Sequence, residues 1–445
     1  MPMKTGLTGK RFVIGSGPLG ESESDESEIF LMPRLPVLVL NGGSSSIKFS
    51  VYDVGNSLRL LCNGEASGIG TPKARFDFHV IENGVRQQQS SESAPQKLDS
   101  FPDAVRKIAE TLDQPGVPRP LAIGHRVVHS GPNLTRHQRI TPEVLADIEQ
   151  AISFAPLHQP IALEIIREAM QHFPGVGNYA CFDTVFHQTM PEVASIYPLP
   201  NKLREQGVHR YGFHGLSFES ILQQFQEGRV PDLMSSARIP ERMIVAHLGN
   251  GVSITAMRDG KSIDTTMGLT PCGGVLMGTR PGDLDPGLIF YLLREQAGGS
   301  ANATDAIEQM LNRRSGLLAL SELSNDMRVL RDAAANGNQQ ATLAIEVFVR
   351  STKKVIGGLI SLMGGVDALV FTGGIGEHDA LSRSQICVGL DAFGIIINPD
   401  KNETTRSGAR RISEQESKTA VYVLPAEEDR RIAAHVAGMA HFRND

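Results

Sequence analysis

Three short apolar segments, each running into a glycine-containing loop, constrain the fold of this 445-residue chain more than any other feature. They are LVLNGGSSS at 38–46, VAHLGNGVS at 245–253 and VFTGGIGEH at 370–378. Glycine lets the backbone come close to a ligand, and loop N–H groups can then point at anionic oxygens. One such loop is usually an ordinary turn, but three of them, each following a buried strand, favour a nucleotide held between two sheets.

Strand and helix patterns alternate around these loops. The polar–apolar alternation at 47–51 predicts a β-hairpin across the first loop, which also lacks the GxxxxGK[ST] signature of a P-loop. Thr-Pro at 141–142 and Asp-Pro at 285–286 are typical helix starts. Since strands and helices alternate throughout, we predict an α/β protein, and the chain length favours two domains.

Composition excludes several classes of protein. Lys and Arg number 43 and Asp and Glu 49, and this mild acidity disfavours nucleic-acid binding driven by phosphate neutralisation. No apolar run is long enough to cross a bilayer, so we expect a soluble, cytoplasmic protein with no membrane partner. Residues 1–34 carry the acidic run ESESDESE, which opposes a packed core, and we predict a disordered N-terminal extension there.

Two arginines stand where a guanidinium needs a partner. Arg126 lies inside the apolar strand pattern IGHRVVH, and Arg280 lies in the short loop MGTRPGD before a predicted helix. Burying a guanidinium without a partner is costly, so each should meet a carboxylate or a phosphate. A buried salt bridge is one interpretation, and charge balance on a phosphoryl group in transfer is the other.

Other polar residues lie at the ends of predicted strands. Asp183 ends the pattern NYACFD, where α/β proteins hold ligands, and could orient an attacking group or a magnesium ion. His214 and His247 are flanked by apolar or glycine residues, which is more typical of core histidines than of catalytic ones. Lys48 could either neutralise phosphate or be a solvated strand lysine, and Asn41 could help to hold hydrated magnesium.

A set of longer motifs resembles the acetate kinase family, in the same order and at similar intervals over residues 36–440. The motifs are NGGSSSIKFSVYD, GHRVVHSG, FDTVFHQTMP, RYGFHGLS, HLGNGVSITAM, MGTRPGDLDP and FTGGIGEH. The resemblance implies a two-domain, actin-like (ribonuclease H-like) fold, with mixed sheets flanked by helices and the active site in the interdomain cleft. It implies an N-terminal domain of 35–187 plus about 425–445, and a nucleotide-binding domain of 188–424.

The resemblance also implies an activity: reversible, direct in-line phosphoryl transfer from ATP to acetate, giving ADP and acetyl phosphate. The implied cofactor is Mg²⁺ or Mn²⁺, and the implied assembly is a homodimer. A propionate kinase on the same scaffold is the nearest alternative, because one methylene changes discrimination by only ~1–3 kcal/mol. An ATP-gated binding protein or a phosphatase of the same fold are alternatives from other classes.

Residue roles follow from the same resemblance. Asp183 would position acetate and metal, Arg126 would bind the carboxylate and the phosphoryl group, and Arg280 and His214 would stabilise charge in the transition state. The implied metal-holding residues are Asn41 and Glu428. The implied acyl pocket is Val128, Leu157, Phe213 and Pro271, with Arg126 at its mouth. The implied nucleotide site is Lys48, His247, Leu248, Gly249, Asn250, Gly251, Asp326, Met327, Arg328, Gly374, Ile375, Gly376, Glu377 and His378.

This chain departs from the family pattern at a few positions. The usual TNEE appears as AEED at 426–429, which keeps Glu428 but makes its neighbour Asp429. His378 stands where an asparagine is usual near the adenosine, and Gly43 and Ser130 are small changes in their motifs.

Overall fold

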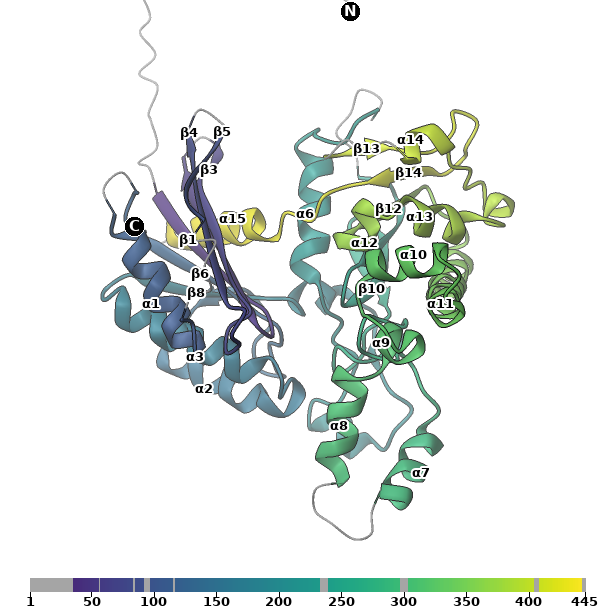
Figure 1. The fold of residues 1–445 in the computed structure, drawn as a ribbon, viewed down its shortest axis with the longest axis horizontal. Helices are drawn as coiled ribbons and strands as arrows, with labels where there is room; N and C mark the ends of the chain where they lie inside the picture. Colours follow the sequence, from purple (N-terminus) through teal and green to yellow (C-terminus); the bar gives the residue numbers. More distant parts are fainter. Residues whose placement is uncertain are drawn as a thin grey trace, which may run out of the picture.

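The protein is described by a computed structural model that covers residues 35–441 apart from 56, 83–84, 92–96, 115–116, 233–238, 297–302 and 404–407. The extension predicted at 1–34 lies outside the described residues. Two mixed sheets, each flanked by helices, make up two halves of the molecule (Figure 1). This arrangement confirms the predicted α/β class.

The first sheet has the strand order β5-β4-β3-β2-β1-β6-β8-β7. The predicted hairpin is confirmed, because β1 and β2 pair antiparallel with Leu40 opposite Phe49, while β6 runs parallel to both β1 and β8. Its strands are β1 (Leu35–Gly42), β2 (Ser46–Val54), β3 (Leu58–Ser67), β4 (Arg75–Glu82), β5 (Val85–Ser91), β6 (Ala122–Val127), β7 (Gln138–Arg139) and β8 (Gly177–Phe182).

Alternate residues of β1 face two different layers of helices. Leu38 and Leu40 pack with α1 (Phe101–Leu112) and α3 (Gln159–His172) on one face of the sheet. Val37 and Val39 pack on the other face with α15 (Glu428–His441), the last described helix of the chain. The strand period of two therefore buries β1 on both sides and brings the C-terminal helix against an N-terminal strand.

The second sheet has the order β11-β10-β9-β12-β14-β13. Helix α11 (Gln339–Met363) covers one face, and α6 (Gly215–Gln226) packs its phenylalanines against the other. β12 runs parallel to β9 and β14, so this sheet is also mixed. Its strands are β9 (Arg242–Leu248), β10 (Val252–Arg258), β11 (Lys261–Thr265), β12 (Ala368–Thr372), β13 (Arg410–Arg411) and β14 (Ala420–Val423).

Side-chain caps begin the helices that were predicted from Thr-Pro and Asp-Pro pairs. The Thr141 hydroxyl accepts the Val144 N–H at the start of α2 (Pro142–Gln150), and the Asp285 carboxylate accepts the Gly287 N–H at the start of α7 (Pro286–Gln296). The glycine segment after β12, predicted as a loop, instead forms the short helix α12 (Gly373–His378). Gly373 permits this because its φ of 76° turns the chain abruptly from strand to helix.

The remaining helices are short or peripheral. They are α4 (Glu192–Ser195), α5 (Asn201–Glu205), α8 (Ala303–Arg313), α9 (Gly316–Ser321), α10 (Met327–Ala335), α13 (Ala380–Cys387) and α14 (Pro399–Glu403), with 3₁₀ turns at Ala151–Phe154, Val185–Thr189 and Asp391–Phe393. Within the described part of the chain, no helix is both long and apolar enough to cross a membrane.

Candidate active site

The ends of β6 and β8 bring a buried ion pair to one edge of the first sheet. Arg126 Nε lies 3.1 Å from Asp183 Oδ1, and Arg126 Nη2 lies 2.6 Å from Asp183 Oδ2. Parallel neighbouring strands end at the same edge, which explains why residues so far apart in sequence meet there. Burial alone would lower the pKa of Arg126, but attraction to Asp183 and Glu428 raises it. The predicted need of Arg126 for an anionic partner is confirmed.

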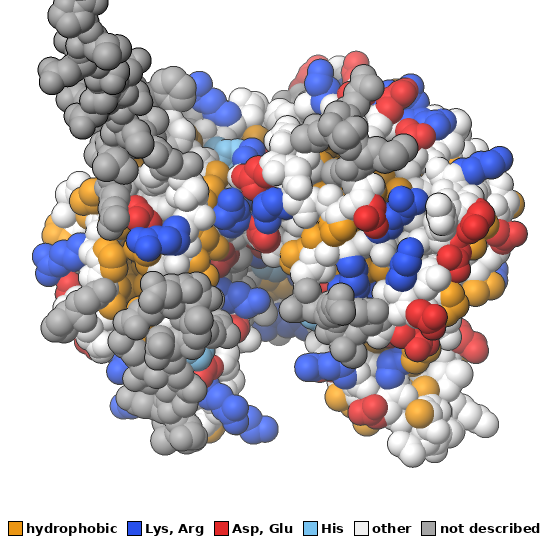
Figure 2. Space-filling view, turned by 90° about the horizontal axis from the view of Figure 1, so that it is seen from above, with side chains coloured by type: hydrophobic (Ala, Val, Ile, Leu, Met, Phe, Trp, Pro, Cys, Tyr) orange, Lys and Arg blue, Asp and Glu red, His pale blue; other side chains and the backbone are white. Residues whose placement is uncertain are grey.

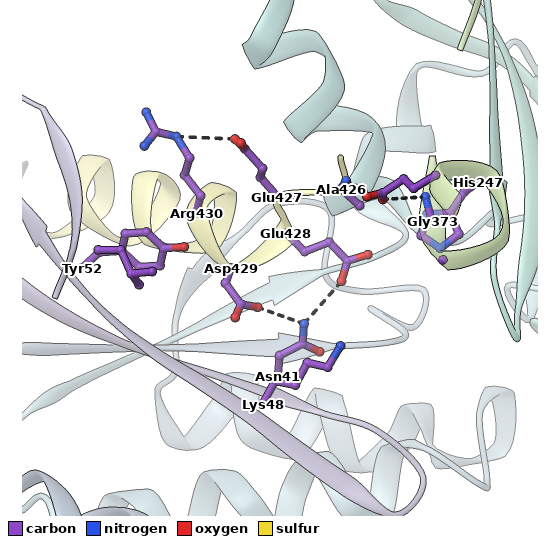
Figure 3. Close-up of a pocket in the computed structure, with 13 residues that line it drawn as sticks. Asn41, Lys48, Tyr52, His247, Gly373, Ala426, Glu427, Glu428, Asp429 and Arg430 are labelled. Atoms are coloured by element: carbon purple, nitrogen blue, oxygen red, sulfur yellow. Dashed lines mark hydrogen bonds and ion pairs between the residues drawn. The ribbon is translucent and has the colours of Figure 1, made fainter. Parts of the chain in front are cut away.

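Two carboxylates converge on Asn41, at the end of β1. Asn41 Nδ2 donates to Glu428 Oε2 at 3.3 Å and to Asp429 Oδ1 at 3.1 Å (Figure 3). Asn41 Oδ1 accepts from Arg126 Nη1 at 3.2 Å. Lys48 lies beside them at the wall of the same cavity. This group therefore joins the start of α15 to the Arg126–Asp183 pair.

These carboxylates carry different proton affinities. Burial tends to raise the pKa of Glu428, but the charge of Arg126 and the hydrogen bond from Asn41 lower it below its ordinary value, so Glu428 is charged at neutral pH. Burial raises the pKa of Asp429, and the nearby charge of Glu428 adds to this effect. The two carboxylates are hard oxygen donors of the kind that a small divalent cation prefers, and the Asn41 amide directs its nitrogen toward them. The donor set therefore fits a metal ion, with Asp429 as an acidic neighbour.

His214 and His247 lie together at the junction of the two halves. Their rings stack with centroids 4.1 Å apart, and each Nδ1 is held by a serine: His214 by Ser253 at 2.9 Å and His247 by Ser217 at 2.9 Å. Burial lowers the pKa of His214 well below its ordinary value and that of His247 to about 4. Both imidazoles are therefore neutral near pH 7.

A left-handed turn places His214 next to Asp183. The φ of His214 is 59°, and the following Gly215 donates its N–H to the Asp183 carbonyl at 2.8 Å. A Cβ added to Gly215 would lie 2.3 Å from that carbonyl oxygen, so only glycine permits this close approach. The uncommon backbone geometry of a non-glycine residue at this point is consistent with a functional constraint.

Arg280 reaches the same region from the second half. Its Nη1 donates to the Pro271 carbonyl at 3.0 Å, and its Nη2 lies 3.3 Å from His158 Nε2. A Cβ added to Gly251 would lie 3.4 Å from the His214 ring and 3.7 Å from Arg280 Nη1, so these three residues converge. Burial lowers the pKa of Arg280. The guanidinium groups of Arg126 and Arg280 therefore both act on the neutral imidazole of His214.

Two cavities share Gly374: the larger is lined by residues of the second half alone, and the smaller lies between the two halves. One, of about 780 Å³, is lined by Gly249, Asn250, Asn325, Asp326, Met327, Arg328, Arg331, Asp332, Gly374, Ile375, His378, Asp379 and Leu381. The other, of about 630 Å³, contains Asn41, Lys48, His247, Gly373, Gly374, Glu377 and Glu428 among its walls. Figure 2 shows the hollow between the halves, with basic, acidic and histidine side chains gathered on its sides. Most of the residues expected to line a nucleotide site therefore lie on two adjoining cavities.

Some residues predicted to line the nucleotide site or the acyl pocket do not line either cavity. Leu248 is fully buried in the core of the second sheet, and Gly376 packs against the backbone of Phe371 and Ala246 in β12 and β9. Val128 and Phe213 belong to that same core. Leu157 directly precedes His158, the partner of Arg280.

Sequence reasoning missed several residues of the site. His158 was overlooked because a single histidine between prolines carries no distinctive signal, and burial together with Arg280 lowers its pKa to about 3. Arg331 and Asp379 line the larger cavity and pair with each other at 3.1 Å across two helices. Only the long-range contacts reveal these residues.

The comparison with known proteins decides the family. The family model described as the acetokinase family matches residues 36–434. The chain belongs to the acetokinase family. The predicted resemblance is therefore confirmed, and with it the predicted identification of an acetokinase-family phosphotransferase.

Relatives in the acetokinase family are similar over almost their whole length. An acetate kinase of Rhodopseudomonas palustris is 42% identical over 409 residues, which cover 91% of this chain and 98% of that protein. The crystal structure of Porphyromonas gingivalis acetate kinase has 36% identity and a TM-score of 0.78, over 91% of this chain and 100% of that one. The crystal structure of a propionate kinase from Francisella tularensis has 35% identity and a TM-score of 0.80, with the same coverage. These neighbours confirm the predicted actin-like fold class.

Proposed function

We propose that this protein is an acetate kinase, which transfers the γ-phosphoryl group of ATP reversibly to the carboxylate of acetate. The observation that carries this proposal is the pair of adjoining cavities, of which the smaller has in its wall Asn41, a hydrogen-bond partner of Arg126. The larger cavity would hold the nucleoside. The smaller, which contains Lys48 and His247, would hold the phosphates.

Arg126 would bind the acetate carboxylate, because it contacts Asn41 and Glu428, which line the phosphate cavity. Asp183 holds the guanidinium by two hydrogen bonds and fixes its plane. One acetate oxygen would then attack the γ-phosphorus while the bond from that phosphorus to the β,γ-bridging oxygen breaks. No proton has to move, because both attacking and leaving oxygens are anionic.

Arg280 and His214 would stabilise the charge on the phosphoryl group in flight. Phosphoryl transfer depends mainly on positioning and on electrostatic stabilisation of the equatorial oxygens. A neutral His214 whose Nδ1 is engaged by Ser253 can present a single Nε2–H donor. His158 would orient Arg280 through the contact between their side chains.

We propose that the divalent metal is Mg²⁺ or Mn²⁺, held by Asn41 and Glu428 largely through water. A bound ion would neutralise charge on the β- and γ-phosphates. The Lys48 ammonium lies in the same cavity and would share this neutralisation. Asp429 stands where the family motif has a second glutamate, and its carboxylate accepts hydrogen bonds from Asn41 and Ser50.

Three broader properties belong to the same proposal. We propose a homodimer in the cytoplasm, as the family resemblance implies. We also propose the domain division 35–187 plus 425–445 and 188–424. The described strands of the first sheet fall in the first range and those of the second sheet in the other, while α15 returns to the first sheet.

The test is a hydroxamate assay for acyl phosphate with Mg-ATP and acetate, propionate or butyrate in parallel. We expect the highest kcat/KM with acetate and almost none in the Asp183→Asn variant, whose ATP binding is measured by calorimetry. A preference for propionate would move the assignment to propionate kinase, the name of one structural neighbour. ATP binding without acyl phosphate from any acid would instead indicate a nucleotide-gated binding protein.

A further inference from the structure

Helix α6 connects the two halves of the molecule. Phe218 and Phe225 pack into the core of the second sheet with Val245. On another face of the helix, Leu216 packs with Val39 of the first sheet and with α15. The helix begins directly after His214, so its position sets where that imidazole lies.

Glu219, one turn into α6, is the centre of a buried polar cluster. Its carboxylate accepts from Arg431 Nε at 3.0 Å, from His137 Nε2 at 3.3 Å and from His435 Nε2. The side chain of Glu219 is 11% exposed and that of His137 8%. Burial would raise the pKa of Glu219, but the hydrogen bonds from the two histidines hold it well below its ordinary value. Glu219 is therefore a charged acceptor.

The donors to Glu219 link it to the two other elements that carry catalytic groups: His137 bonds to the end of β8, and the other two lie on α15. His137 accepts the Phe182 N–H through Nδ1 at 3.1 Å, and Phe182 directly precedes Asp183. Arg431 and His435 lie on α15, one and two turns after Glu428. One carboxylate on the His214 helix thus contacts the Asp183 strand, through His137, and the Glu428 helix.

His137, Glu219 and His435 also have the composition of a zinc site, since their ligand atoms lie within 4.8 Å of one another. Two contacts oppose that interpretation. The Phe182 N–H occupies His137 Nδ1, so the ring proton resides on Nε2, which then donates to Glu219 and has no free lone pair. Arg431 already balances the charge of the carboxylate. The contacts favour a hydrogen-bonded junction.

We propose that Glu219 is a positioning residue for phosphoryl transfer, which holds His214 in register with Asp183 and Glu428 by joining α6 to β8 and α15. The inference rests on the proposed acetate kinase activity. It adds a residue that contacts no substrate and that no family motif in the sequence singles out. Small misplacement of catalytic groups costs about 100-fold in rate, so a partial loosening here has a measurable effect.

The experiment compares Glu219→Gln with Glu227→Gln in the full-length protein. Glu227 caps the other end of α6, has the same charge and also pairs with an α15 arginine, Arg430, at 3.4 Å. We expect Glu219→Gln to lower kcat about ten-fold while the KM for ATP stays within two-fold, because the cavity assigned to the nucleoside is built from other elements. Glu227→Gln should retain wild-type kcat.

His435→Leu provides a second variant, since it removes one donor without leaving a charge unpaired. Like Glu219→Gln, it should lower kcat and leave the KM for ATP unchanged. Thermal melting and ATP calorimetry on each variant separate this effect from unfolding. Wild-type kcat in both folded variants would overturn the proposal.

Two further outcomes are distinguishable. Absence of acyl phosphate from the wild type would overturn the proposed function itself, whatever the variants do. Stoichiometric Zn²⁺ binding to the nucleotide-free wild type that is lost in Glu219→Gln would show that the cluster is a metal site. That result would overturn the proposal of a hydrogen-bonded junction.

Discussion

At the scale of single residues, Arg126 is the side chain on which the site depends most. It holds the carboxylate of Asp183, donates to Asn41 and lies within 3.9 Å of Glu428. Removal of the guanidinium leaves Asp183, whose side chain is 1% exposed, without its ion-pair partner. We therefore expect Arg126→Ala to raise the KM for acetate and to lower kcat by about 100-fold or more, as measured by the hydroxamate assay.

The matched control for that variant is Arg242→Ala. Arg242 also forms a two-point ion pair, with Asp367, but at the far end of β9 and with its side chain 31% exposed. Its removal should cost stability and leave kcat close to that of the wild type. Activity of Arg126→Ala within a few-fold of the wild type would contradict the role assigned to it.

Val128 offers a prediction about substrate length. It follows the β6 strand that carries Arg126, and it is 8% exposed in the core beside Phe213. Val128→Ala removes two methyl groups and makes room for one more methylene on the acid. We expect the ratio of kcat/KM for propionate to that for acetate to rise about ten-fold, which corresponds to ~1.4 kcal/mol. An unchanged ratio would show that Val128 does not line the acyl pocket.

At the scale of elements, the packing of α15 on β6 positions Glu428. A Cβ on Gly124 would lie 2.5 Å from Ile432 Cγ2 and 2.8 Å from Val436 Cγ2, both on α15. Gly124→Ala should therefore push the helix outward, lower the free energy of unfolding by about 1–3 kcal/mol and raise the concentration of Mg²⁺ needed for half-maximal activity. Chemical unfolding and a metal titration of the activity measure the two effects.

Gly357→Ala is the corresponding control. Gly357 lies inside α11, and a Cβ there meets nothing within 4 Å. The same change of residue should raise stability by about 0.5–1 kcal/mol, since alanine favours the helix. Equal stabilisation by Gly124→Ala would mean that α15 does not rest on that glycine.

At the scale of the whole molecule, buried histidines make stability depend on pH. Burial lowers the pKa of His125, His187 and His247 to about 4 from 6.5. Between these two pKa values the unfolded chain binds protons that the folded chain does not, so stability falls as the pH drops from 6.5 towards 4. For His125 alone the loss at pH 5 is roughly 2 kcal/mol.

A single variant isolates this contribution. His125 lies in the first sheet, bonded to Asn178 at 2.8 Å, and belongs to neither cavity. In His125→Gln the difference in free energy of unfolding between pH 7 and pH 5 should shrink by that amount, measured by denaturant titration. An undiminished pH dependence would show that His125 does not contribute through protonation.

Much of the local structure could be predicted because its causes are local. The hairpin at β1–β2 follows from alternation of apolar residues, and the starts of α2 and α7 follow from capping side chains next to proline. The prediction was wrong for the segment at Gly373–His378, where a positive φ at one glycine begins a helix instead of a loop. Glycine content alone does not distinguish these outcomes.

The sequence by itself determined the α/β class, the strand that carries Arg126 and the strand end that carries Asp183, and its long motifs led to the family. Tertiary structure alone decided which of these residues meet. The Arg126–Asp183 pair needs parallel pairing of β6 with β8, and the Asn41–Glu428 contact joins residues 387 apart in the chain. Glu219 and His435 likewise meet only because α6 packs on α15. Such contacts depend on the packing of whole elements, which no local pattern of residues encodes.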